Sequence, residues 1–134
     1  MGSAKLNTIE EAIADLKNGR IIIVVDDEDR ENEGDFVLLA NKATAEKINF
    51  LAKHGRGLIC VAMTIERLKQ LNIEPMVMRN SSLMGTAFTV SVDYVHGTTT
   101  GISASDRAVT IKALTDPGAV ATDFARPGHV FPIA

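Results

Sequence analysis

The sequence predicts an α/β (α+β) fold, a layered sandwich built on a mixed β-sheet. Two short apolar runs rich in β-branched residues, at 21–25 and 58–63, are typical of strands buried on both faces, and we expect both at the centre of the sheet. Residues 87–94 instead alternate apolar and polar side chains, which is typical of a strand with one wetter face. Helical patterns separate these runs, and helices interleaved with strands favour a layered domain.

Each expected helix begins after a hydroxyl residue that can cap its first turn. Thr8, with Glu11 at capping-box spacing, precedes apolar residues at helical intervals, and this helix is expected to end at the Asn18-Gly19 pair. Further helices are expected after Thr44, Thr64 and Ser103. The last of these also has capping-box spacing, so Ser103 and Asp106 need do nothing beyond starting a helix.

Length and composition limit the classes of protein to consider. The chain has 134 residues, 46% of them apolar and 23% charged, which suits one globular domain. We expect residues 1–5 to be a non-native or disordered start and residues 6–134 to be the domain. No apolar run approaches the roughly 18 residues that span a bilayer, and no signal peptide is visible, so we expect a cytoplasmic protein with no membrane partner. The single cysteine, Cys60, excludes an internal disulfide.

An acidic block dominates the charge pattern. Residues 26–35 contain seven acids and one base, a net charge of −6, whereas the rest of the chain carries +3 from 13 bases and 10 acids. Such a block argues against a nucleic-acid surface there and favours a cation. It follows an expected strand, where α/β proteins commonly bind ligands, and carboxylates suit Mg²⁺. A solvated acidic loop explains the composition about equally well.

Two known metal-site patterns can be compared with this block. With Gly34 as the sixth position of an EF-hand, the twelfth would be Ala40 instead of a bidentate Glu, so that interpretation fails. The spacing of Asp27 and Asp29 after a strand resembles the nucleophile loop of haloacid-dehalogenase-type phosphotransferases that use Mg²⁺. Glu31 stands where that family has Thr or Val, which leaves it as the alternative.

Four motifs follow one another along the chain. The first is the acidic block, and the other three are His-Gly-x-Gly-x-Ile-Cys at 54–60, Thr-Thr-Gly-Ile-Ser-Ala-x-Asp-Arg at 99–107, and Arg-Pro-Gly-His-Val-Phe-Pro at 126–132. In this order they resemble the motifs of one enzyme family, the 3,4-dihydroxy-2-butanone 4-phosphate synthases of riboflavin biosynthesis, whose signature loop the acidic block matches almost letter for letter. Together they span most of the chain, so they are far more specific than any one motif.

The resemblance implies a lyase that converts D-ribulose 5-phosphate to L-3,4-dihydroxy-2-butanone 4-phosphate and formate, with Mg²⁺ or Mn²⁺ as cofactor. It implies that Glu31 binds the metal and that His129, with Glu33 and Asp35, is catalytic. Substrate contacts are expected from this set: Arg30, Glu31, Asp35, Thr99, Thr100 and Arg107. Asn32 and Gly34 are expected to shape the loop, while Cys60, His54 and His96 are given no chemistry.

The resemblance also implies partners for this chain, and in one respect the chain departs from the family's pattern. Family members are homodimers with active sites near the subunit interface, and some are fused to a GTP cyclohydrolase II domain. The family continues through a Gly-His-Thr-Glu segment and a Cys-Glu segment, which supply a second metal ligand and a further essential Glu and are absent here. Val130, Phe131 and Ile133 also begin an apolar run with nothing after it to cover it. We therefore expect a domain incomplete at its C-terminus, and an inactive or complementable fragment stays an alternative.

Overall fold

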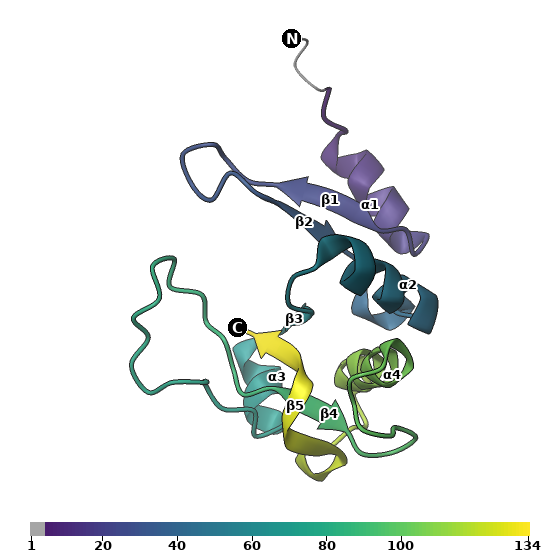
Figure 1. The fold of residues 1–134 in the computed structure, drawn as a ribbon, viewed down its shortest axis with the longest axis vertical. Coiled ribbons are helices and arrows are strands. Elements are labelled where there is room, and N and C mark those ends of the chain that lie inside the picture. Colours follow the sequence, from purple (N-terminus) through teal and green to yellow (C-terminus); the bar gives the residue numbers. More distant parts are fainter. Residues whose placement is uncertain (1–4) are drawn as a thin grey trace.

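Within residues 5–134, two small sheets and four α-helices make up the fold (Figure 1). The structure is a computed structural model that describes residues 5–134; of the expected disordered start, residues 1–4 lie outside the described residues. Strands β1 (Ile22–Val25) and β2 (Gly34–Val37) form an antiparallel hairpin. The second sheet has the order β3-β5-β4. Its strands are β3 (Cys60–Ala62), β4 (Val92–Tyr94) and β5 (Phe124–Ile133).

The mixed sheet that the sequence predicts is confirmed in the second of these sheets. β5 pairs parallel with β3, so that Cys60 lies opposite Phe131. The same strand pairs antiparallel with β4, with Tyr94 opposite Phe124. β5 is therefore the central strand, and it brings the segment around residue 129 next to both of its neighbours.

The predicted helix starts are also confirmed. The helices are α1 (Ile9–Lys17), α2 (Ala45–Phe50), α3 (Ile65–Gln70) and α4 (Ala104–Thr115). Thr8, Thr44, Thr64 and Ser103 each accept a backbone N–H of the first turn. α2 continues into a π-helical turn, Leu51–Gly55, and 3₁₀ turns lie at Ala40–Lys42 and Ala121–Asp123.

The hydrophobic core lies where α2 and α4 meet the second sheet. α4 packs against α2, β4 and β5, and Figure 1 shows α3 beside the same sheet. Fully buried side chains include Ile48 on α2, Leu71 after α3, Val92 on β4 and Val130 on β5. Because Val130 is fully buried in this core, its packing restricts the position of the neighbouring His129 on β5.

The expectation of two central strands buried on both faces is wrong. Ile23, Val24 and Val25 are 64%, 49% and 52% exposed, because within residues 5–134 β1 pairs only with β2 in a sheet of two strands. β3 is an edge strand in which only Val61 is buried. The apolar runs correctly identified strands but not their coverage, which depends on residues far away in sequence.

The strand expected at 87–94 is regular only in β4, and its polar side is more buried than predicted. Thr89 is 3% exposed, because its hydroxyl donates to the Pro132 carbonyl at 2.7 Å and so satisfies its polarity inside the sheet. In the part of the chain that the structure describes, no helix combines the length and apolar character needed to cross a bilayer.

Candidate active site

The acidic loop at residues 26–33 connects β1 to β2 and is organised by Asp26. The two Asp26 carboxylate oxygens accept the backbone N–H groups of Glu31 and Glu33, both at 2.9 Å, and the Arg30 guanidinium donates at 3.1 Å. The Glu33 and Glu31 N–H groups lower the pKa of Asp26, and the charge of Arg30 acts in the same direction. Asp26 thus turns a run of mutually repelling acids into a defined loop.

The predicted ligands in this loop lie together on its exposed side. Arg30 and Glu31 form an ion pair, with Nη2 3.4 Å from Oε1. Asn32 adopts a left-handed conformation (φ 52°) and so provides the bend that the sequence analysis expected of both Asn32 and Gly34. Gly34 instead begins β2 with ordinary strand geometry, opposite Val25. The loop therefore presents Glu31 and Glu33 on a short, hydrogen-bonded turn.

The donor chemistry of the loop fits Mg²⁺, which prefers oxygen ligands and often takes only one or two protein carboxylates. Glu31 offers such a carboxylate on the exposed side of the loop. Among residues 5–134, however, no three His, Cys, Asp or Glu side chains are grouped as a complete metal site.

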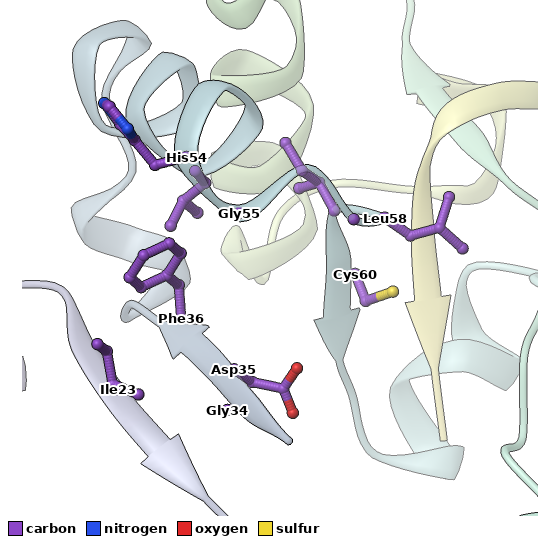
Figure 2. A pocket seen from close by; sticks show the side chains of 11 residues that line it. Ile23, Gly34, Asp35, Phe36, His54, Gly55, Leu58 and Cys60 are labelled. Carbon is purple, nitrogen blue, oxygen red and sulfur yellow. The ribbon is translucent and has the colours of Figure 1, made fainter. Parts of the chain in front are cut away.

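Asp35 lies in a pocket of about 460 Å³ between β2, the π-helical turn and β3. Figure 2 shows its carboxylate extending toward Cys60, while the His54 ring points away from the pocket. Partial burial, and secondarily the charge of Asp35, raise the pKa of the Cys60 thiol. A raised pKa favours the neutral thiol of Cys60 over the thiolate, which is the nucleophilic form of cysteine.

His129, on β5, is paired with an aspartate that the sequence analysis did not select. Asp93 accepts from the His129 backbone N–H at 2.8 Å, and its second carboxylate oxygen lies 2.7 Å from Nδ1. Because a carboxylate only accepts, Nδ1 must carry the hydrogen in this pair. In the neutral ring Nε2 then has its lone pair available, and within residues 5–134 it has no hydrogen-bond partner. The imidazole, 39% exposed, can therefore accept a proton from a bound molecule.

Two glycines make this pairing sterically possible. A Cβ atom at Gly128 would overlap the Val92–Asp93 peptide, and one at Gly101 would overlap the Asp93 carboxylate. The Gly128 N–H also donates to the Ser91 hydroxyl at 3.0 Å. The backbones on both sides of Asp93 thus approach it more closely than any other residue type would allow.

Thr99, Thr100 and Arg107, the other predicted substrate contacts, belong to the loop before α4 and to that helix. The Thr99 hydroxyl donates to the buried Asp106 carboxylate at 2.8 Å, whereas Thr100 is exposed. Nε of Arg107 is buried without a hydrogen-bond partner in the described residues. Thr100 and Arg107 therefore keep free hydrogen-bonding capacity, while Thr99 has used its donor.

Arg126, in the same motif as His129, has a structural role. Its guanidinium donates to the carbonyls of Leu71 and Asn72 at the end of α3 and to those of Phe124 and Ala121. Leu71 and Asn72 directly follow α3, and Ala121 and Phe124 belong to the 3₁₀ turn and the start of β5, so Arg126 ties the end of α3 to the beginning of β5.

The predicted residues fall into two groups that share no hydrogen bond or ion pair within residues 5–134. The first is the hairpin group of Arg30, Glu31, Glu33 and Asp35, and the second is the group of His129, Thr99, Thr100 and Arg107. Three aspartates that hold some of these residues were missed as site residues: Asp26 binds Arg30, Glu31 and Glu33, Asp93 binds His129, and Asp106 binds Thr99. The sequence showed only that Asp93 lies on the polar side of residues 87–94. It could not show the pairing with His129, because that residue lies 36 positions away in sequence.

Comparison with known proteins gives a consistent set of relatives. The family model described as 3,4-dihydroxy-2-butanone 4-phosphate synthase matches residues 10–134. Riboflavin biosynthesis protein RibBA of Aquifex aeolicus is 59% identical over 131 residues, which are 96% of this chain and 32% of that protein. 3,4-Dihydroxy-2-butanone 4-phosphate synthase of Agrobacterium fabrum is 57% identical over 125 residues, 93% of this chain and 59% of the relative.

Solved structures agree with the sequence relatives. A crystal structure of 3,4-dihydroxy-2-butanone 4-phosphate synthase in complex with two magnesium ions superimposes with a TM-score of 0.93 at 46% identity, covering 96% of this chain and 60% of that one. RibBX, a two-domain synthase from A. baumannii, gives a TM-score of 0.88 at 44% identity, covering 95% and 37%. The predicted layered fold with a mixed sheet is confirmed. The chain spans about a third of the RibBA relative and about three-fifths of the Agrobacterium protein.

Proposed function

The chain belongs to the 3,4-dihydroxy-2-butanone 4-phosphate synthase family, and from this we propose that it carries the proton-transfer half of a lyase site in riboflavin biosynthesis. The substrate is D-ribulose 5-phosphate, and the products are L-3,4-dihydroxy-2-butanone 4-phosphate and formate. The observation that carries the proposal is the pairing of His129 Nδ1 with Asp93 at 2.7 Å, which leaves Nε2 available as a base. The phosphotransferase alternative gains no support from the relatives reported above.

The reaction requires an enediol to form, the carbon skeleton to rearrange and C4 to leave as formate. Each step removes a proton or places negative charge on a sugar oxygen. His129 accepts a proton at Nε2, and Asp93 stabilises the resulting imidazolium while holding the ring in place. Glu33 and Asp35 supply further carboxylates for proton exchange at the hairpin.

Glu31 is the metal ligand that this chain contributes. Support comes from its exposed carboxylate in a loop held by Asp26, and from the two magnesium ions in the related crystal structure. Glu31 would hold a Mg²⁺ ion, which when bound would polarise sugar oxygens and neutralise the negative charge that develops on them. Arg30 pairs with Glu31 and keeps that carboxylate oriented.

Thr100 and Arg107 bind substrate oxygens in this proposal. Both side chains retain hydrogen-bonding capacity, and the guanidinium fork of Arg107 suits phosphate. Thr99 contributes less than the sequence analysis expected, because its hydroxyl hydrogen already points to Asp106. Its oxygen still accepts hydrogen bonds.

The functional unit that we propose is a cytoplasmic homodimer, without nucleic-acid or membrane partners. The exposed apolar face of β1, with Ile23 at 64% exposure, and the exposed Met78 and Leu83 supply surface for a second copy. Fusion to a GTP cyclohydrolase II domain stays a prediction, and the greater length of the RibBA relative is compatible with it. An inactive or complementable fragment remains the second candidate, favoured by the incomplete ligand set in residues 5–134.

The test is formate production from ribulose 5-phosphate labelled with ¹³C at C4, followed by NMR with Mg²⁺ or with EDTA. The sequence should be assayed both as the 134-residue chain and within a complete gene of the family. Metal-dependent labelled formate from the complete protein, abolished by His129→Ala, is expected. Released inorganic phosphate would instead favour the phosphotransferase. Activity in the complete protein but silence of the short chain, reversed by adding the remaining segment in trans, would identify a complementable fragment.

A further inference from the structure

Asp106 is a buried carboxylate that does more than begin a helix. It is 5% exposed and lies in the first turn of α4, where its own N–H donates to the Ser103 cap at 3.0 Å. One of its oxygens, Oδ2, accepts three bonds from the preceding loop: Thr99 N–H at 3.2 Å, the Thr99 hydroxyl at 2.8 Å and Gly101 N–H at 2.9 Å. A helix cap alone requires none of these three bonds.

The loop that Asp106 holds is packed directly against Asp93. Gly101 is buried, with φ 96°, and a side chain there would overlap both carboxylate oxygens of Asp93. Asp93 in turn holds the backbone and ring of His129. A continuous series of contacts therefore runs from Asp106 through Gly101 and Asp93 to the imidazole.

The direction of these contacts indicates what Asp106 does. If the Gly101 N–H lost its acceptor, residues 99–101 would be free to shift, because within residues 5–134 Asp106 is the only side chain that accepts hydrogen bonds from them. The loop backbone forms one wall of the space that Asp93 occupies. A displaced wall would let the carboxylate rotate, and Nδ1 would lose the partner that fixes its tautomer.

We propose that Asp106 is a positioning residue for His129, acting through the Thr99–Gly101 loop and Asp93. The inference rests on the proposed function for its effect on turnover, but its structural claim is independent of activity. Asp106 does not contact the imidazole and does not accept a proton from the substrate. It sets the tautomer and the angle of the His129 ring, which accepts that proton.

The test replaces Asp106 and follows the His129 ring by ¹⁵N NMR, which reports which nitrogen carries the proton. Asp106→Ala should lose the Nδ1–H signature of the Asp93-bound ring and lower kcat about ten- to a hundredfold, with a smaller change in KM. Asp106→Asn retains an oxygen at the Oδ2 position and should restore most of both signals. Ser103→Ala removes the helix cap but leaves the loop bonds, so it should resemble the wild type in both readouts.

Several outcomes would overturn the inference. A wild-type Nδ1–H signal in folded Asp106→Ala would do so, as would Ser103→Ala reproducing the loss. If Asp106→Ala does not fold, Thr99→Val decides the matter, because it removes one loop bond without touching α4. An unchanged His129 signal in that variant would contradict the proposal. NMR needs no substrate, so a protein that makes no formate would refute the proposed function while the positioning claim is still tested.

Discussion

Asp93 contacts His129 at two points, the backbone N–H at 2.8 Å and the ring Nδ1 at 2.7 Å. One contact fixes the strand and the other fixes the side chain, so the ring cannot rotate without breaking a bond to a carboxylate that is only 15% exposed. This arrangement joins β4 to β5 at the irregularity between Val92 and Asp93, where the strand register shifts. The contact between Asp93 and His129 therefore lies directly beside this irregularity.

The first prediction concerns Asp93→Asn in the complete protein. An amide in this position presents an N–H group to Nδ1 or loses one of the two contacts, so the ring adopts the other tautomer and Nε2 no longer accepts a proton. We expect kcat to fall by about 10²- to 10⁴-fold with the fold retained. Formate release and circular dichroism measure the two effects, and turnover near the wild-type level would exclude the assigned role.

The second prediction concerns Glu31→Gln. Loss of this charge weakens Mg²⁺ binding and removes stabilisation of negative charge on the sugar, so turnover should drop about a hundredfold or more. Glu28→Gln is the matched control, since Glu28 is exposed in the same loop. Activity should be measured across a Mg²⁺ titration. Equal activity of the two variants at saturating metal would remove Glu31 from the site.

The third prediction concerns the stability of the acidic loop at low pH. The pKa of Asp26 is lower in the folded loop than in the unfolded chain, so the unfolded state binds more protons at low pH. The stabilisation from Asp26 is complete above its unfolded value of about 3.9 and is lost as the pH falls through the lower folded value. Amide-exchange protection of Glu31 and Glu33 should decrease over that acidic range. Asp26→Asn should have weak protection at all pH values, and a pH-independent wild-type loop would contradict the assignment.

The fourth prediction compares two glycines. Gly128→Ala places a methyl group into the Val92–Asp93 backbone, which cannot yield as a flexible side chain would, and should destabilise the fold by about 3 kcal/mol or more. Gly57→Ala meets no atom within 4 Å and should have little effect. Urea unfolding measures both variants, and similar midpoints would show that β4 and β5 separate easily.

The fifth prediction concerns Arg126→Lys. A lysine retains the charge but cannot reach carbonyls on both sides, so at least two of the four contacts should be lost. We expect a loss of about 2 kcal/mol in the free energy of unfolding, without a specific effect on kcat. Arg79→Lys, on the exposed 75–86 segment, serves as the control. A selective loss of kcat in Arg126→Lys would indicate substrate contact instead.

Local signals in the sequence were sufficient to place the helices. Thr8 and Ser103 cap their helices as predicted, because a cap depends on residues three or four positions away. The apolar run at 21–25 was correctly identified as a strand but was assigned too much burial, because coverage depends on the number of neighbouring strands and not on the run itself.

The site was predictable only where a single motif contained it. Residues 26–35 lie together because one hairpin carries them, whereas His129 and Asp93 come from different strands. Asp106 was correctly placed at a helix start, but its sequence position gave no sign that its carboxylate binds the loop before it. The supporting residues that the sequence did not reveal are therefore of two kinds. Asp93 has a partner that is distant in sequence, and Asp106 has a spacing that helix capping already explains.

The position of β5 between β3 and β4 determines when this sheet can assemble. The two outer strands do not pair with each other, and both depend on the segment Phe124–Ile133. During synthesis on the ribosome, the edges of β3 and β4 therefore stay unpaired in this sheet until that segment has been synthesised. Closing the long loop from Cys60 to Phe131 costs chain entropy before any sheet contact compensates for it, which makes this a slow step in folding. During that delay the nascent chain exposes unpaired strand edges, which favours association with chaperones.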